Sequence, residues 1–214
     1  MSILRRKMKD LVRVPLTELK KRARILVIDD EECSFPFDLL RKEGYSIDHW
    51  TEVKNLRDLE EGLYDIIILD ITGVAKKYDK NDGLGILEHL KDVNPSQIIV
   101  AFSGQTFDLS KNRFWKLADD ALAKPVDVTK CKRLLDTMIE KKMTIEHYWQ
   151  GLVSILKNEG VKEKEIKKIE KKLVEAFKQG KNANIREIFR SVIEKAETIS
   201  KLFLIGTKIY LLVK

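Results

Sequence analysis

Four short apolar runs of this sequence each lead into polar side chains that could perform chemistry. In chain order these side chains are the pair Asp29 and Asp30, then Asp70, then Ser103, then Lys124. Carboxylates, a hydroxyl and an amine are the groups that hold a divalent cation and a phosphoryl group. The question for the rest of the sequence is whether it brings these residues together.

Three carboxylates in one place would repel one another and raise one another's pKa unless a cation compensates them. Mg²⁺ prefers oxygen ligands and keeps several waters, so two or three carboxylates and a backbone carbonyl would suit it. Asp70 could then attack a phosphorus centre while the metal and Lys124 neutralise the phosphoryl oxygens, and Ser103 would offer its hydroxyl to one of them. In isolation, Asp29 and Asp30 would be interpreted as a helix cap, Asp70 as a turn residue and Ser103 as part of a plain loop.

The surrounding sequence predicts elements that would position these residues. Continuous β-branched runs, typical of strands buried on both faces of a parallel sheet, alternate with helical apolar spacing. Five βα units in this order predict an α/β fold with a doubly wound five-stranded parallel sheet, whose ligands bind outside the carboxyl ends of the strands. The predicted strands are residues 25–28, 45–50, 65–69, 97–102 and 121–123, and the predicted helices are residues 37–43, 56–62, 84–93, 109–118 and 128–141.

These motifs, in this order and at strand ends, resemble the response regulator receiver (CheY-like) family over roughly residues 24–140. The resemblance rests on Asp29-Asp30, Asp70, Phe102-Ser103-Gly104 and Ala123-Lys124-Pro125. It implies a flavodoxin-like receiver fold and a Mg²⁺ cofactor. For the metal, the resemblance implies that Asp29 and Asp30 hold it, with Asp30 as a direct ligand, and that Asp70 and the backbone carbonyl of Thr72 are further ligands. For the phosphoryl group, it implies that Asp70 is the acceptor and Ser103 the switch hydroxyl. It also implies a cis-prolyl bond after Lys124.

The sequence departs from the family pattern in three ways. The loop after Asp70 reaches its aspartate-glycine pair, Asp82-Gly83, only after a long basic stretch, and the usual proline is absent from it. This loop is expected to influence which phosphodonor or kinase docks. Ala121 stands where the family commonly has an aromatic residue, so Phe102 or Trp115 would have to take over the role of that residue.

The charge distribution and the helical pattern predict three parts. Residues 24–139 hold 16 basic and 22 acidic side chains, between flanks that are both basic, within a chain of net charge +7. The predicted parts are a basic N-terminal arm over residues 1–23, a receiver domain over 24–141 and a helical output or dimerisation domain over 142–214, with helices at 144–158, 162–178 and 185–213. The last helix carries more apolar residues than one stripe, which predicts that it is buried in a bundle or covered by a partner or a second copy.

Several classes of protein are disfavoured by composition. No apolar run reaches the roughly 20 residues needed to cross a membrane, and the leader lacks the features of a secretory signal, so a cytoplasmic location is expected. The two cysteines, Cys33 and Cys131, have no metal-like spacing and are interpreted as packing residues.

The favoured function is a two-component response regulator that is not an enzyme. A histidine kinase or phosphotransfer protein would phosphorylate Asp70, and the C-terminal helices would signal to a protein partner. One alternative is a DNA-binding transcriptional regulator, which the basic termini would support although no helix-turn-helix is found. The other is a phosphatase of the haloacid dehalogenase type, because residues 70–73 have some similarity to its first motif; against it, Thr72 stands where those enzymes need a general acid.

Overall fold

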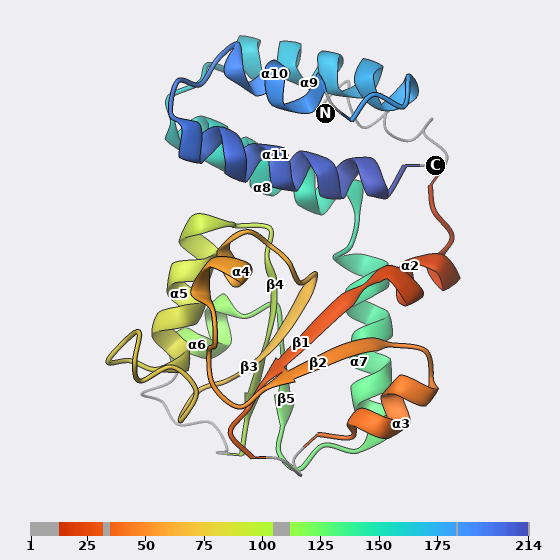
Figure 1. Cartoon of the computed structure of the whole chain (residues 1–214), viewed down its shortest axis with the longest axis vertical. Helices are drawn as coiled ribbons and strands as arrows, with labels where there is room; N and C mark the ends of the chain where they lie inside the picture. Colours follow the sequence, from red (N-terminus) through yellow and green to blue (C-terminus); the bar gives the residue numbers. More distant parts are fainter. Residues whose placement is uncertain (1–12, 32–34, 105–111, 183, 214) are drawn as a thin grey trace. The chain divides into compact units, whose positions relative to one another are not determined.

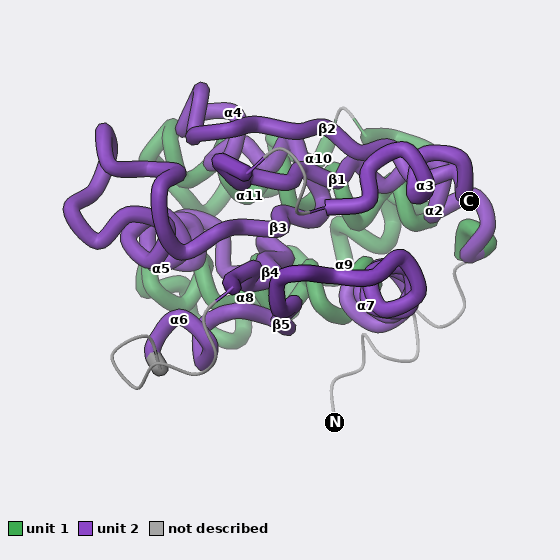
Figure 2. Tube along the Cα trace, turned by 90° about the horizontal axis from the view of Figure 1, so that it is seen from below, with its two compact units in different colours: residues 1–15, 143–214 green, residues 16–142 purple. Residues whose placement is uncertain are grey.

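The computed structural model describes residues 13–31, 35–104, 112–182 and 184–213, and the chain divides into two units (Figure 2). The sheet unit runs from Leu16 to Lys142. The helical unit combines residues 13–15 with residues 143–213. The predicted domain boundaries at residues 23 and 141 stay a prediction.

A five-stranded parallel sheet in the order β2-β1-β3-β4-β5 forms the centre of the sheet unit (Figure 1). Ile28 pairs with Leu69, Asp70 with Phe102, and Ser103 with Ala123, so the carboxyl ends of four strands lie along one edge of the sheet. This strand order is that of the flavodoxin-like doubly wound sheet. The predicted α/β fold class is confirmed. The strands are β1 (Arg24–Ile28), β2 (Ser46–Trp50), β3 (Ile66–Asp70), β4 (Ile98–Ser103) and β5 (Asp120–Ala123).

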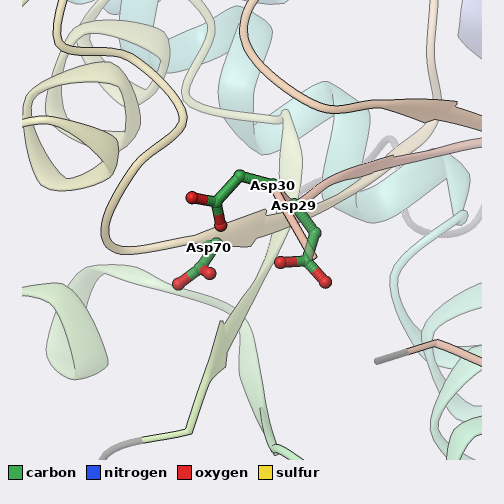
Figure 3. A group of neighbouring side chains, drawn as sticks. All are labelled: Asp29, Asp30 and Asp70. Atoms are coloured by element: carbon green, nitrogen blue, oxygen red, sulfur yellow. The ribbon is translucent and has the colours of Figure 1, made fainter. Parts of the chain in front are cut away.

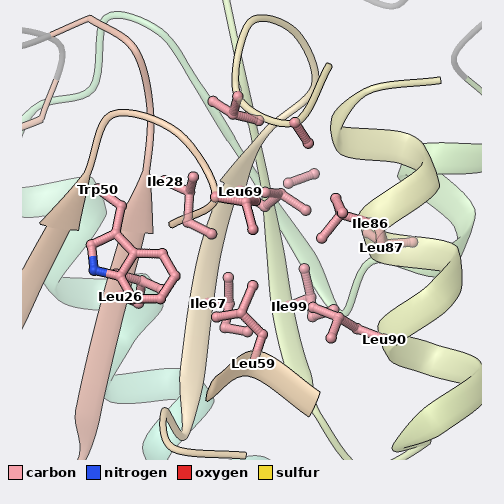
Figure 4. Packing of buried hydrophobic residues seen from close by; sticks show 14 of the residues in the cluster. Leu26, Ile28, Trp50, Leu59, Ile67, Leu69, Ile86, Leu87, Leu90 and Ile99 are labelled. Atoms are coloured by element: carbon pink, nitrogen blue, oxygen red, sulfur yellow. The ribbon is translucent and has the colours of Figure 1, made fainter. Parts of the chain in front are cut away.

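Helices cover both faces of this sheet, as Figures 1 and 2 show. Successive side chains of a strand point to opposite faces. Ile67 and Leu69 of β3 therefore reach the same side, where they pack with Leu87 and Leu90 of α5 in a core that Figure 4 shows. The helices on this face are α4 (Leu56–Glu60), α5 (Gly83–Val93) and α6 (Asn112–Leu117); α3 (Phe37–Lys42) and α7 (Val128–Lys141) lie on the other face.

A largely buried carboxylate, that of Asp119, fixes the ends of two helices to the sheet. Asp119 accepts hydrogen bonds from the amines of Lys91 at 2.6 Å and Lys142 at 3.1 Å, and from the backbone N–H of Ile99 at 2.9 Å. Lys91 lies in the last turn of α5, and Lys142 is the C-terminal cap of α7. Asp119 thus holds both helices to the strand β4.

The helical unit contains α8 (Ile145–Asn158), α9 (Glu163–Lys178), α10 (Asn184–Arg190) and α11 (Ala196–Leu211). Helix α11 contacts α8 and α10, and α10 contacts α9. Two residues from the other end of the chain join this unit: the backbone N–H of Val14 donates to the carbonyl of Leu212 at 3.2 Å, and Arg13 forms an ion pair with Glu146 at 2.7 Å.

The prediction of one helix over residues 185–213 is wrong. The chain breaks between α10 and α11, where the N–H groups of Val192 and Ile193 both bond back to the carbonyl of Phe189 and the helix ends in a turn. The break lets α10 fold back against α11, at a place where a Cβ on Gly206 would lie only 2.8 Å from Ile185. Two shorter helices therefore bury each other's apolar side chains, which explains the excess of such residues.

Part of the predicted basic arm is helical. Residues 16–22 form α2 (Leu16–Arg22), with Glu18 in the first turn and basic residues in the last turn. This distribution of charge suits the helix dipole. Residues 1–12, with half of the arm's basic side chains, lie outside the described residues, as does Cys33. Cys131 is buried on α7, as predicted.

None of the described helices has both the length and the apolar character that crossing a membrane requires. The expected cytoplasmic location stays a prediction.

Candidate functional site

Three aspartates gather at the carboxyl ends of β1 and β3. Asp70 is the last residue of β3, and Asp29 follows the last residue of β1, the neighbouring strand. Both are buried, with 0% of Asp29 and 4% of Asp70 exposed, whereas Asp30 is exposed. One carboxylate oxygen from each of the three lies within 4.8 Å of the others, and Figure 3 shows Asp30 and Asp70 side by side with Asp29 next to them.

Lys124 completes this cluster from the end of β5. Its Nζ lies 2.6 Å from Asp29 Oδ1 and 2.6 Å from Asp70 Oδ2, and 3.4 Å from Glu31 Oε2. Its backbone N–H donates to the carbonyl of Ser103 at 2.9 Å, which fixes the residue beside β4. The Lys124–Pro125 peptide bond is cis, as the family resemblance implies.

The charges of the cluster do not balance. Burial alone would lower the pKa of Lys124, but its hydrogen bonds to Asp29 and Asp70 raise the pKa above the ordinary value of 10.5. Burial raises the pKa of Asp70, and the charge of Asp29 acts in the same direction, while the hydrogen bonds from Lys124 and Thr72 oppose it. In the part of the chain that the structure describes, the Lys124 ammonium therefore stands against the carboxylates of three aspartates and of Glu31, and the excess negative charge favours a bound cation.

The donor set fits a hard divalent cation. All three ligand groups are carboxylates, whose oxygens Mg²⁺ and Ca²⁺ prefer, and they stand close enough together to share one ion. Asp30 faces solvent, so water could fill further positions of the coordination sphere. The residues present thus suit the Mg²⁺ that the sequence predicted.

The other predicted site residues lie around this cluster. Ser103 is the buried last residue of β4, one position beyond Phe102, the register partner of Asp70. Thr72 is exposed, and its backbone N–H donates to Asp70 Oδ1 at 3.3 Å. The same oxygen accepts from the N–H of Ile71. All predicted site residues are therefore found at one edge of the sheet.

The two aromatic residues considered as substitutes at Ala121 lie in different environments. Phe102 is fully buried beside the cluster, with Lys124 Nζ 5.0 Å from its ring centroid and Phe35 packed edge-on at 5.8 Å. Trp115 packs instead on the core beneath α4, α5 and α6. Of the two, Phe102 is the aromatic side chain that touches the site.

Three residues of this neighbourhood were missed by sequence reasoning. His49 of β2 lies with Nε2 2.9 Å from the carbonyl of Asp29, so this nitrogen must carry the proton. Glu31 contacts the amine of Lys124, and the carboxylate of Asp82 accepts a hydrogen bond from the backbone N–H of Gly73, in the loop that follows Asp70. A histidine in a strand and an aspartate before a glycine are too common to have signalled these contacts.

No protein-family model matches this chain, and no curated protein matches it. Solved structures similar to it include a CheY-like response regulator receiver domain protein from Methanospirillum hungatei JF-1, at 19% identity and TM-score 0.47, covering 56% of this chain and 95% of that one. A two-component response regulator from Clostridium difficile is 23% identical with TM-score 0.44, covering 56% of this chain and 98% of that one. A putative response regulator from Chloroflexus aurantiacus J-10-fl is 20% identical with TM-score 0.46, and the match covers 56% of this chain and 98% of that one.

Proposed function

We propose that this chain is a two-component response regulator in which Asp70 accepts a phosphoryl group in a Mg²⁺-dependent reaction and the helical unit passes the signal to a protein partner. The observation that carries the proposal is the position of Lys124, whose amine lies 2.6 Å from both Asp29 and Asp70 while Asp30 completes the acidic cluster. An aspartate, a paired lysine and an acidic pair at one sheet edge are the groups that aspartyl phosphorylation needs.

Asp29, Asp30, Asp70 and the backbone carbonyl of Thr72 would hold the metal. When bound, Mg²⁺ supplies positive charge next to the oxygens of the phosphoryl group.

The residues of the chain would divide the remaining tasks. Oδ1 of Asp70 is held by the backbone N–H groups of Ile71 and Thr72, while Oδ2 contacts the amine of Lys124. Oδ2 would form the bond to phosphorus, and the bond from phosphorus to the donor would break, so that the leaving group departs with the electron pair. The ammonium of Lys124 would then contact the phosphoryl oxygens, and the hydroxyl of Ser103 would donate a hydrogen bond to one of them.

The phosphodonor would be a histidine kinase or a phosphotransfer protein. The proposal makes the chain a phospho-acceptor rather than an enzyme with turnover. The haloacid dehalogenase alternative lacks support at Thr72, because a threonine cannot protonate a leaving group as an aspartic acid does.

One observation favours a second candidate for the output, a nucleic-acid partner. Helix α9 exposes a set of lysines that outnumbers its exposed glutamates: Lys164, Lys167, Lys168, Lys171, Lys172 and Lys178 against Glu163, Glu165 and Glu175. Binding to a polyanion through these lysines would weaken steeply as salt is added. Titration of the phosphorylated chain with duplex DNA at two salt concentrations tests this candidate.

Intact mass spectrometry after incubation with Mg²⁺ and acetyl phosphate tests the main proposal. The expected result is the addition of one phosphoryl group, lost in Asp70→Asn and retained in Asp92→Asn, which removes an exposed carboxylate from α5. Consumption of many equivalents of acetyl phosphate without a stable adduct would favour the phosphatase. Absence of any adduct would overturn the proposal and leave a receiver fold that signals without phosphorylation.

A further inference from the structure

The loop between β3 and α5 is built around an aspartate with an unusual backbone. Asp82 has φ 56° and ψ −130°, and among the described residues it is the only non-glycine with positive φ. Such a conformation is strained for an L-residue with a side chain and persists only where surrounding contacts enforce it. Asp82 is also 8% exposed, so its carboxylate is held inside the protein.

The contacts of this carboxylate are not those of an ordinary helix cap. Asp82 occupies the N-cap position of α5, where an aspartate usually accepts from the first turn of its helix, yet its side chain makes no capping hydrogen bond. Its Oδ2 accepts instead from the N–H of Gly73 at 2.6 Å, and its Oδ1 from the N–H of Ala75 at 2.6 Å. The side chain therefore turns back towards the residues that follow Asp70.

The hydrogen bond to Gly73 fixes the direction of a group on the previous residue. The N–H of Gly73 and the carbonyl of Thr72 belong to one planar peptide unit, and in a trans unit they point in opposite directions. Holding the N–H on Asp82 thus aims the Thr72 carbonyl away from Asp82. This carbonyl is the backbone oxygen that the proposed function assigns to the metal.

Gly73 also touches the acidic cluster directly. A Cβ on Gly73 would overlap the carboxylate of Asp30, so this side chain packs against the bare backbone of the glycine. On the other side, the N–H of Gly83 donates to the carbonyl of Ile71 at 3.0 Å, and a Cβ on Gly83 would overlap the carbonyl oxygen of Asp70. Residues 82 and 83 therefore contact the backbone of residues 70–73 and hold it in place beside the acidic cluster.

We infer that Asp82 is a positioning residue for the cation site, which holds the Thr72–Gly73 peptide so that the Thr72 carbonyl and the Asp30 carboxylate are in place before any ion binds. This inference rests on the proposed function, since it concerns the same metal. It explains how a loop longer than the family pattern keeps its first residues ordered beside the site. Asp82 contacts neither substrate nor metal in this assignment.

Two substitutions of Asp82 separate positioning from simple stability. Asp82→Asn keeps the size of the side chain but places an amide N–H₂ opposite one of the two N–H donors. Asp82→Gly removes both hydrogen bonds and also removes the backbone strain, so its metal-free melting temperature should stay close to that of the wild type. The matched control is Asp79→Asn, which removes a carboxylate from the same loop. Asp79 Oδ1 accepts a local hydrogen bond from the N–H of Asn81 at 2.6 Å.

Two measurements on the full-length chain test the inference. In amide hydrogen exchange without metal, Gly73 and Ala75 should exchange faster in both Asp82 variants than in the wild type or in Asp79→Asn. In calorimetric titration with Mg²⁺, both variants should bind roughly 10- to 100-fold more weakly, the usual cost of losing a residue that orients a metal ligand. Asp79→Asn should bind with nearly unchanged affinity.

The opposite results are distinguishable. Wild-type affinity for Mg²⁺ in both Asp82 variants, or unchanged exchange at Gly73, overturns the inference and leaves the proposed function intact. A wild-type chain that binds no Mg²⁺ overturns the inference and the proposed function together.

Discussion

Lys124 and Asp70 form an ion pair of 2.6 Å, although Lys124 follows β5 and Asp70 ends β3, with the strand β4 between them. The lysine side chain therefore crosses the end of a whole strand to reach the acidic cluster. Because it also touches Asp29, it is the counter-ion of the two buried carboxylates in the metal-free protein.

Replacement of Lys124 by alanine should destabilise the metal-free protein by about 3 kcal/mol, since removing one partner leaves buried carboxylates uncompensated. Mg²⁺ should restore part of the loss by taking over the role of the cation. Urea unfolding with and without Mg²⁺ measures both effects. The control is Lys77→Ala, whose ion pair with Glu52 is exposed and should contribute little. Unchanged metal-free stability in Lys124→Ala would show that the carboxylates do not depend on this amine.

Asp30→Asn should separate metal binding from folding. Its carboxylate is exposed and adds to the repulsion among the three aspartates, so its loss should not lower the metal-free melting temperature. The Mg²⁺ dissociation constant should rise by at least about tenfold, because affinity follows the number of charged ligands. Asp38→Asn, which removes an exposed charge from α3, is the control in calorimetric titration. Equal affinities of the two variants would exclude Asp30 as a ligand.

Gly83→Ala tests the close packing of Gly83 against the backbone of Asp70. A methyl group there would overlap the carbonyl oxygen of Asp70, and the backbone must move to admit it, at a cost of about 1–3 kcal/mol. At Gly104 the same methyl group would meet, among the described residues, the side chain of Lys124 at an ordinary contact distance of 3.6 Å, so Gly104→Ala should be nearly neutral. Thermal unfolding of the two variants compares them. The prediction fails if both glycines tolerate alanine equally.

Asp119 should make the stability of the protein depend on acid pH. Burial alone would raise its pKa, but the Lys91 ammonium, the N–H of Ile99 and Lys142 outweigh burial and hold the pKa below 3.8. A carboxyl group whose pKa is lowered by folding stabilises the protein above its unfolded pKa, and this contribution is lost as pH falls through the folded value.

Asp119→Asn should therefore cost about 2 kcal/mol at pH 7, the usual size for hydrogen bonds to a charged group. The difference from the wild type should shrink once the pH falls below 3.8. Urea unfolding of wild type and Asp119→Asn at pH 7 and at a pH below 3.8 measures this difference in stability. The control is Asp120→Asn, which removes the exposed carboxylate of the next residue. A difference that is the same at both pH values would contradict the assignment.

The sheet was predictable because its signal is local. Runs such as residues 25–28 and 65–69 are β-branched and continuous, and a buried parallel strand needs that pattern on both faces. The site followed from the sheet, since parallel strands bring their carboxyl ends to one edge, and Asp29, Asp70 and Lys124 each stand at such an end.

Other features depend on packing that a local pattern does not encode. The break between α10 and α11 arises because two helices cover each other, and the apolar spacing of residues 185–213 continues through it. The role of Asp82 depends on which N–H groups lie near its carboxylate, whereas Asp-Gly in a sequence indicates only a turn. The helix α2 did have a signal in Pro15, Glu18 and the basic residues at its end, typical of a helix start and stop.

The pairing of Val14 with Leu212 has a consequence for how the chain is connected. Residues 13–15 and residue 143 belong to the same unit, so the sheet unit is an insert that is tethered at both of its ends. The chain therefore joins the two units covalently at two points, residues 15–16 and residues 142–143, and cutting one of these connections would leave the other. Expression of residues 143–214 alone would lack the partner of Leu212, so a fragment meant to isolate the helices should carry Arg13 and Val14 as well.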